Sequence, residues 1–181
     1  MRAVTPHGVL VLIVLVAAGA VALAEPPSPC TVDVRSAEFA FWVGDWDVRL
    51  GDGRLAGRNS IRYAEMGCRI EEHWSPAGGG GGSSISFLDP ADGVWEQIWH
   101  SPDGIFFRIR GSLKAPGDML MTGTVHYLAQ GAAAPLRGRW TQLENGGVRQ
   151  YFEQFDSEAM AWRPWFEGFY TRAEGAASAD R

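Results

Sequence analysis

The sequence has few lysines, cysteines and histidines, and these shortages narrow the classes of function. Only Lys114 is a lysine among the 16 basic residues, which face 21 acidic ones, so the formal net charge is −5. A nucleic-acid surface needs clustered positive charge, and this balance does not supply it. With 23 glycines and 10 prolines in 181 residues, a helical bundle or a coiled coil is also disfavoured.

Familiar catalytic and metal-binding motifs are absent as well. The chain has no C-x-x-C and no G-x-S-x-G, and the run Gly78 to Gly82 lacks the Gly-Lys-Ser/Thr ending of a phosphate loop. We expect this run to be a flexible hairpin loop, or a mobile portal over a barrel mouth. His73, His100 and His126 fall in the outward phase of predicted strands and lack the spacing of metal ligands, so no metal and no cofactor are predicted.

The long apolar run of the chain lies at its N-terminus. Gly8 to Ala24 carries no charge, follows Arg2 and ends in Ala22-Leu23-Ala24, an A-x-A cleavage site. A membrane anchor is disfavoured because 17 residues are the lower limit for a span and no basic flank follows them. The sequence therefore predicts a signal peptide over residues 1–24 and an exported protein, either periplasmic or extracellular, with no stable membrane anchor.

Two cysteines, Cys30 and Cys68, remain after this cleavage. Two thiols in an oxidising compartment are more often bridged than free, so we predict a disulfide that staples an N-terminal arm, residues 25–36. The closed loop would stabilise the fold by about 3–4 kcal/mol. Residues 37–172 are predicted to form one domain, and the small and polar residues 173–181 a disordered tail.

From Gly44 onward the apolar residues alternate with polar ones, which is typical of antiparallel strands. About ten strands are predicted, over residues 45–50, 58–65, 68–75, 83–88, 94–100, 105–111, 119–127, 136–143, 148–156 and 162–172. A meander of this length leaves two sheet edges unless it closes, so an all-β barrel is favoured. The one helical candidate, Ser36 to Trp42, is expected to plug one barrel end with Ser36 as its cap.

Eight tryptophans in a chain of this size require either a filled aromatic core or an aromatic-lined cavity. The strand phases direct a set of aromatic side chains inward, Tyr63 and Phe87 among them, although near 162–170 both faces are partly aromatic. Glu72 is the most informative inward residue, because an unpaired carboxylate is costly to bury. The ligand-binding residues predicted on this inward face are Asn59, Glu72, Trp74, Trp95, Gln97, Trp99 and Gln150.

Glu72 also has an interpretation that involves no ligand. Its carboxylate would then accept hydrogen bonds from tryptophan indoles and glutamine amides, or pair with an arginine at the barrel rim. The two interpretations differ in whether space for a ligand remains beside Glu72.

Gly44-Asp45-Trp46, at the head of the first predicted strand, resembles the G-x-W signature of lipocalins and the wider calycin superfamily. The resemblance implies a barrel with Trp46 packed at its closed end and a basic residue of the last strand, Arg172, over that ring. Residues 41–48, 67–74, 87–90 and 95–99 are similar to uncharacterised exported bacterial lipocalin-like proteins of a domain-of-unknown-function type. Nitrobindin-like haem proteins share the barrel type, but no motif here identifies a haem-ligating histidine.

These features favour non-covalent binding of a small hydrophobic or amphipathic ligand by an exported barrel. One alternative is a calycin-type isomerase or hydrolase that uses Glu72 as a general base. Another is a filled barrel whose outer surface contacts a partner protein. An open aromatic cavity around Glu72 would be compatible with both the binding and the enzyme hypotheses. An interior filled by tryptophan rings would be compatible only with the partner-protein hypothesis. No nucleic-acid partner is predicted, and the sequence leaves the oligomeric state open.

Overall fold

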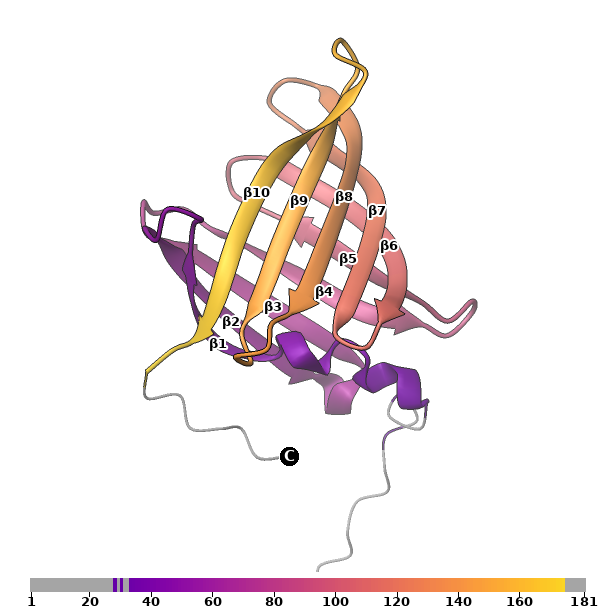
Figure 1. Cartoon of the computed structure of the whole chain (residues 1–181). Helices are drawn as coiled ribbons and strands as arrows, with labels where there is room; N and C mark the ends of the chain where they lie inside the picture. The colour runs from indigo at the N-terminus through magenta and orange to yellow at the C-terminus, as the bar shows by residue number, and fades with distance from the viewer. Residues whose placement is uncertain (1–27, 29, 31–32, 175–181) are drawn as a thin grey trace, which may run out of the picture.

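Ten antiparallel strands joined in chain order form a closed barrel (Figure 1) in the computed structural model, which describes Ser28, Cys30 and residues 33–174. The strands are β1 Gly44–Arg49, β2 Leu55–Ala64, β3 Arg69–Pro76, β4 Gly82–Asp89, β5 Val94–His100, β6 Ile105–Ala115, β7 Asp118–Tyr127, β8 Ala132–Gln142, β9 Val148–Asp156 and β10 Ala161–Arg172. Because β1 pairs with β10, the sheet has no free edge. The predicted all-β barrel is confirmed, while the predicted signal peptide over 1–24 and residues 175–181 of the predicted tail lie outside the described residues.

Two 3-10 turns, η1 (Val34–Ala37) and η2 (Ala40–Trp42), lie across one end of the barrel (Figure 1). Phe39 and Trp42 are fully buried there, with their ring centroids 4.9 Å apart. Phe39 also packs edge-on against Trp95 and Trp140 of the barrel wall, at centroid distances of 5.7 and 5.2 Å. The N-terminal helical segment therefore closes this end with aromatic packing, as predicted. We call η1, Phe39 and η2 together the plug.

The cap of the plug differs from the prediction. Asp33 is the N-cap of η1, and its carboxylate accepts a hydrogen bond from the Arg35 backbone N–H at 3.0 Å. Ser36 lies inside η1. Because a capping side chain must come from the residue before the first turn, the earlier start of η1 gives this role to Asp33.

The Gly44-Asp45-Trp46 motif holds the closed end together. The Arg172 guanidinium carbon lies 3.8 Å from the centroid of the Trp46 ring. Gly44 has a φ of +146°, and a Cβ on it would lie 1.6 Å from Arg172 Nη1, so only glycine leaves room for this guanidinium. Trp46 Nε1 donates a hydrogen bond to the Trp42 carbonyl oxygen at 2.9 Å, which ties β1 to the plug. This is the packing that the lipocalin resemblance implies.

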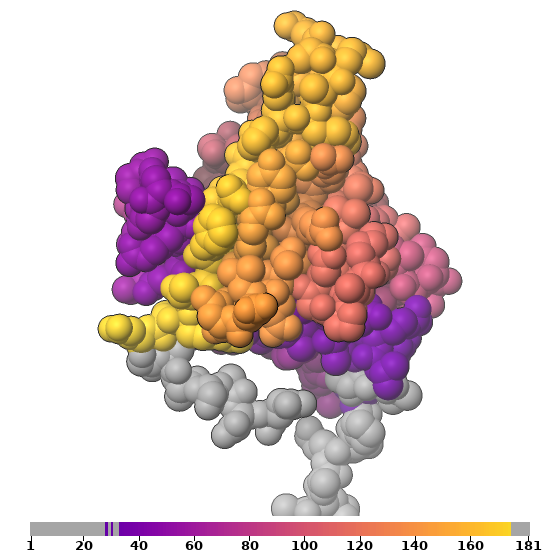
Figure 2. Space-filling model, viewed as in Figure 1, coloured from indigo at the N-terminus to yellow at the C-terminus, as the bar shows by residue number. Residues whose placement is uncertain are grey.

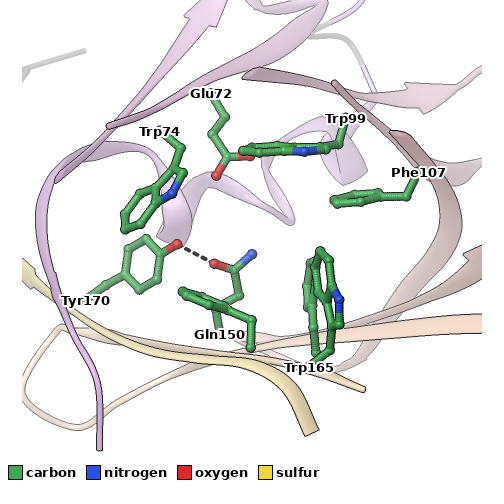
Figure 3. Close-up of a pocket in the computed structure, with 9 residues that line it drawn as sticks. Glu72, Trp74, Trp99, Phe107, Gln150, Trp165 and Tyr170 are labelled. Carbon is green, nitrogen blue, oxygen red and sulfur yellow. Dashed lines mark hydrogen bonds between the residues drawn. The ribbon is translucent and has the colours of Figure 1, made fainter. Parts of the chain in front are cut away.

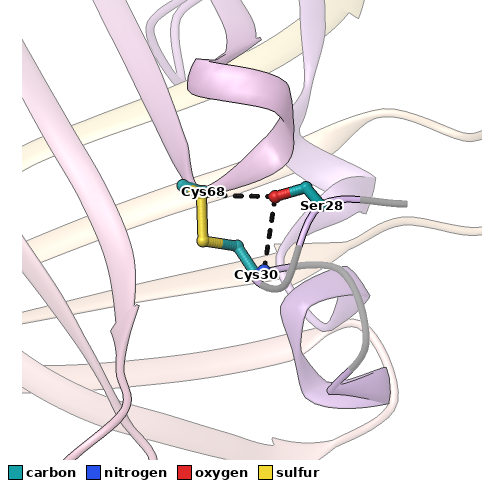
Figure 4. Close-up of a disulfide and its surroundings, with 3 residues drawn as sticks. All are labelled: Ser28, Cys30 and Cys68. Carbon is teal, nitrogen blue, oxygen red and sulfur yellow. Dashed lines mark hydrogen bonds between the residues drawn. A yellow bond between two sulfur atoms is a disulfide. The ribbon is translucent and has the colours of Figure 1, made fainter. Parts of the chain in front are cut away.

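The predicted disulfide between Cys30 and Cys68 is confirmed, with a Cα–Cα distance of 4.8 Å (Figure 4). Cys68 lies between the 3-10 turn η3 (Glu65–Gly67) and β3, at the same barrel end as the plug. Ser28 Oγ accepts a hydrogen bond from the Cys30 backbone N–H at 3.3 Å. The bridge therefore fastens the N-terminal arm beside the closed end.

Two aromatic residues predicted inside the barrel lie elsewhere. Tyr63, near the end of β2, is 43% exposed. In β4 the buried positions are Ser84 and Ser86, which places Phe87 in the outward phase. The serines face inward because Ser84 pairs in register with Glu72 of β3, so a polar patch continues from one strand to the next.

The closed end of the barrel is densely packed. Among the described residues, the largest fully buried side chains of the whole barrel interior are Trp42, Trp46, Trp140, Tyr170, Phe39, Ile61, Ile70, Ile109, Met119, Met121, Leu136 and Gln97. At the opposite end the hairpin of β9 and β10 stands above the other loops (Figure 2). Within the described residues, no helix has the length and apolar character needed to cross a membrane.

Candidate functional site

A cavity of about 200 Å³ lies inside the barrel, towards the end that faces away from the plug. Seven of the nine lining side chains are aromatic, and Glu72, Gln150 and the Tyr170 hydroxyl supply its polar groups (Figure 3). The lining residues are Glu72, Trp74, Trp99, Phe107, Gln150, Phe152, Trp165, Phe166 and Tyr170. With ~30 Å³ as the share of one liquid water, the cavity has the volume of roughly seven waters, which is enough for a small organic molecule.

The polar side of the cavity is organised around Glu72. Asn59 Nδ2 donates to Glu72 Oε1 at 2.7 Å, and Ser84 Oγ donates to Glu72 Oε2 at 2.6 Å. Gln97 Nε2 donates in turn to Ser84 Oγ at 3.2 Å. Four strands thus contribute to one buried network, because Asn59, Glu72, Ser84 and Gln97 lie on β2, β3, β4 and β5.

The same network reaches the facing strands through Tyr170. Asn59 Nδ2 also donates to Tyr170 Oη at 3.2 Å, and the Tyr170 hydroxyl donates to Gln150 Oε1 (Figure 3). Burial and the nearby Glu72 carboxylate raise the pKa of Tyr170 well above its ordinary value, so its hydroxyl remains a donor. With its oxygen bonded to Tyr170, Gln150 turns its amide nitrogen towards the cavity (Figure 3).

Glu72 is buried, and within the described residues it has no cationic partner. Burial raises the pKa of this carboxyl to about 7, and the hydrogen bonds from Asn59 and Ser84 only partly oppose that effect. Among the residues described, no indole, glutamine amide or arginine donates to Glu72, whose donors are the Asn59 amide and the Ser84 hydroxyl. Near neutral pH the group is therefore able to accept or to release a proton.

Two glycines make room for the rings beside Glu72. A Cβ on Gly82, the first residue of β4, would lie 2.3 Å from Trp99 Cζ2. A Cβ on Gly57 of β2 would lie 2.8 Å from Trp74 Cη2 and closer still to the backbone of β3. Because neither position tolerates a side chain, each indole is able to lie against bare backbone. Gly82 is also the last glycine of the predicted loop, which continues directly into this contact.

Trp165 is a cavity residue that the strand pattern did not predict. The register between β10 and β9 shifts between Pro164 and Phe166, so Trp165 and Phe166 both line the cavity. Trp165 stacks on Phe152 of β9, with the ring centroids 6.0 Å apart and the planes 13° apart. A signal was present in the sequence, since proline within a strand marks a bulge or an edge.

The structure brings four of the seven predicted ligand-binding residues to the cavity wall, namely Glu72, Trp74, Trp99 and Gln150. Asn59 and Gln97 lie behind this wall, where Asn59 contacts Glu72 directly and Gln97 contacts it through Ser84. The network therefore holds the carboxylate in place from the side opposite the cavity.

Other residues singled out from the sequence lie away from the cavity. Trp95 faces the interior at the closed end, where its Nε1 donates to Glu38 Oε2 of the N-terminal segment at 3.2 Å. His73, His100 and His126 occupy outward positions of β3, β5 and β7. In the described part of the chain, no group of three or more histidines, cysteines or carboxylates is arranged to hold a metal ion.

Comparisons with known proteins identify no particular family for this chain. No family model matches the chain. A β-galactosidase from an Arthrobacter species is 26% identical over 148 residues. The alignment covers 78% of this chain and 19% of that relative, so the chain spans about a fifth of the length of the protein it matches. The closed ten-strand antiparallel barrel fits a calycin-like fold.

Proposed function

We propose that this protein is an exported lipocalin-like barrel that binds one small amphipathic molecule non-covalently in the cavity beside Glu72. The observation that carries the proposal is the lining, in which six aromatic rings surround a wall formed by Glu72, Gln150 and Tyr170. Ligand sites commonly combine an apolar surround with a few orienting polar groups. The disulfide supports export, because such bridges persist in oxidising compartments.

The packing of the barrel supports binding over a wholly structural interior. The plug and the rings behind it fill the closed end, while Trp74, Trp99, Trp165 and Phe166 remain only partly buried around the cavity. A barrel stabilised by aromatic packing alone would gain by filling this space, since cavities are destabilising. The space is instead lined with rings and ends at a polar wall.

A second candidate function is acid–base catalysis on the bound molecule. The raised pKa of Glu72, about 7, and its place in the cavity wall are what a general base requires. Glycoside hydrolysis normally uses two carboxylates that flank the scissile bond. Glu72 is the single carboxylate among the nine lining residues, so we do not extend the activity named for the relative to this chain.

The proposed function is tested by ligand-observed NMR and by native mass spectrometry of protein purified from its own host. The probes are 2-phenylethanol, 2-phenylethylammonium and phenylacetate, whose shared skeleton suits the cavity volume. We expect at least one probe to bind. Phe166→Trp should weaken that binding at least tenfold, because the larger ring extends into the cavity.

The matched control is Phe169→Trp, which makes the same change on the same strand but outside the cavity lining. It should bind as the wild type does. If no probe binds and the purified protein carries no retained molecule, the binding proposal fails, and a role for the outer surface in contacting a partner protein takes its place.

A further inference from the structure

Two glutamates of this barrel, Glu72 and Glu96, are almost equally buried but differ in the charge of their partners. Glu96 is 2% exposed and has two cationic partners, with Arg108 Nε at 2.9 Å and Arg110 Nε at 3.0 Å. Glu72 is 4% exposed, and uncharged Asn59 and Ser84 are its hydrogen-bond partners in the described residues. An ionised carboxylate buried without a counter-charge is strongly unfavourable, so the difference requires an explanation.

We propose that the counter-charge of Glu72 is the ligand itself, and that the cavity takes a small organic cation with a flat apolar body, of the arylalkylammonium type. This inference rests on the proposed binding function and names the chemical class of the ligand. The ammonium group lies against the Glu72 carboxylate, and the apolar body extends among the rings towards Trp165 and Phe107. No covalent step is involved.

The rings beside the carboxylate favour the same charge. The Glu72 carboxylate lies between Trp74 and Trp99 in the cavity wall (Figure 3). Aromatic faces attract cations, and tryptophan does so most strongly. The lining includes no lysine, arginine or histidine, so an anionic ligand would meet only a like charge and ring faces. A cation is therefore the charge type that both the carboxylate and the rings stabilise.

Two buried acceptor oxygens also lie in the network behind Glu72. Asn59 Oδ1 and Gln97 Oε1 are buried, and neither has a hydrogen-bond partner in the part of the chain that the structure describes. Asn59 contacts Glu72 directly, and Gln97 does so through Ser84. Both residues lie behind the cavity wall, so their oxygens add partial negative charge and no positive charge to the surroundings of Glu72.

The size of the cavity limits the body of the cation. At roughly 20 Å³ per non-hydrogen atom, close to the density of protein interiors, a volume of about 200 Å³ holds roughly ten such atoms. A phenyl or small bicyclic ring with a short alkylammonium arm meets this limit. A long acyl chain or a tetrapyrrole does not.

The three probes introduced above separate charge from shape. Isothermal titration at pH 8 should show 2-phenylethylammonium binding at least tenfold more tightly than its neutral analogue 2-phenylethanol. Phenylacetate should bind most weakly. Equal or tighter binding of 2-phenylethanol would overturn the cation inference while leaving the binding proposal intact. Failure of all three probes, with no retained molecule, would remove both.

Two variants of β3 test whether Glu72 is the source of the preference. Glu72→Gln should abolish it, so that the ammonium and the alcohol bind within about twofold of each other. The matched control, Glu71→Gln, removes a neighbouring carboxylate that pairs with Arg69 instead of lining the cavity. It should retain the full preference. Equal losses in both variants, or no loss in Glu72→Gln, would contradict the inference.

A titration of the wild type gives an answer even if Glu72→Gln fails to fold. The probe is benzyltrimethylammonium, whose charge does not depend on pH. With the pKa of Glu72 at about 7, its affinity should rise about tenfold from pH 6 to pH 8, as the ionised fraction of this carboxyl rises. The affinity of 2-phenylethanol should not rise in this way. A flat profile for the cation would overturn the inference.

The groups that face Glu72 within the barrel do not titrate in this range. They are Asn59 of β2, Ser84 of β4, Gln97 of β5, Gln150 of β9 and Tyr170 of β10, and the pKa of Tyr170 lies well above 10. His73, on the same strand as Glu72, occupies an outward position. Substituting His73 by Gln should leave the pH profile of the cation unchanged, which separates the two groups.

Discussion

Glu72 gives the cavity an ionisable group, and the ionised form of that group lowers the stability of the fold. Its carboxylate is enclosed by neutral hydrogen-bond donors and rings, so its ionised form is destabilised in the folded protein. In the unfolded chain the same carboxyl is solvated and ionises at an ordinary pH. Folding and ionisation of Glu72 therefore oppose each other.

This opposition predicts a pH dependence with a definite sign. The folded pKa of Glu72 is about 7 and its ordinary value is 4.5, so stability is fully retained below the unfolded pKa and falls as the pH rises towards 7. A shift of this size corresponds to about 3 kcal/mol. The free energy of unfolding of the wild type, relative to that of Glu72→Gln, should decrease by that amount between pH 4.5 and pH 8.

Urea denaturation of both proteins at several pH values measures this difference. Groups common to the two proteins cancel in the comparison, including the histidines on the outer face. Glu71→Gln, compared in the same way, should not reproduce the effect, because Glu71 is paired with Arg69 outside the cavity lining. Curves for wild type and Glu72→Gln that stay parallel throughout would show that burial does not perturb this carboxyl.

The sequence indicated Glu72 because a carboxylate stood in the inward phase of a strand between Ile70 and Trp74. It did not indicate Ser84, which completes the site, because the apolar residues Ile85 and Phe87 favoured the opposite phase of β4. An apolar pattern identifies the inward face only where that face is apolar. Beside a buried carboxylate the inward positions are polar, so the pattern is misleading there.

Among the elements, the strands were predictable and their irregularities were not. Alternation and turn residues located ten strands, because each half-buried strand carries its own period of two. The bulge in β10 depends on how β10 pairs with β9, and pairing across strands is not a local property of the sequence. Pro164 marked the place, but only the observed register showed that Trp165 turns into the cavity.

The plug is an element whose contribution to stability is predicted to be large. Phe39 is fully buried and contacts the rings of Trp42, Trp95 and Trp140. Phe39→Ala should lower the free energy of unfolding by about 3–5 kcal/mol, because it removes a ring and leaves a cavity. Val34→Ala, at an 87% exposed position of the same segment, should change it by less than ~0.5 kcal/mol.

Urea denaturation followed by tryptophan fluorescence provides the measurement. Equal stability of the two variants would show that the plug only covers the barrel end. The probe affinities of folded Phe39→Ala should remain close to those of the wild type, because Phe39 is not part of the cavity lining.

In the whole molecule, the disulfide joins a segment outside the barrel to the barrel itself. Cys30 and Cys68 are 38 residues apart in the sequence. Replacing both by serine should lower the free energy of unfolding by about 3–4 kcal/mol, by restoring freedom to the unfolded chain. The variant should keep the circular dichroism of a β-barrel. An unchanged urea midpoint, with wild-type protein under oxidising conditions as the reference, would contradict this expectation.

The barrel as a whole followed from the meander and from the resemblance at Gly44-Asp45-Trp46, but the state of its interior did not. The sequence shows how many aromatic rings the interior holds. Their number and volume do not show whether they fill the interior or leave a cavity between them. Gly57 and Gly82 contribute to the open space, because each allows an indole, that of Trp74 or Trp99, to pack directly against the backbone of the sheet. Whether such a glycine faces an indole depends on strand register, which only the folded chain supplies.

Cys30, bonded to Cys68, and Arg172, paired with Trp46, both lie at the plugged end of the barrel, so the described chain begins and ends at this end (Figure 1). The loops around the cavity lie at the opposite end. A surface linker joined beside Cys30 or Glu174 would therefore leave the loops around the cavity facing outward. Tethered to a sensor surface at one of these positions, the protein would still present its cavity to the solution.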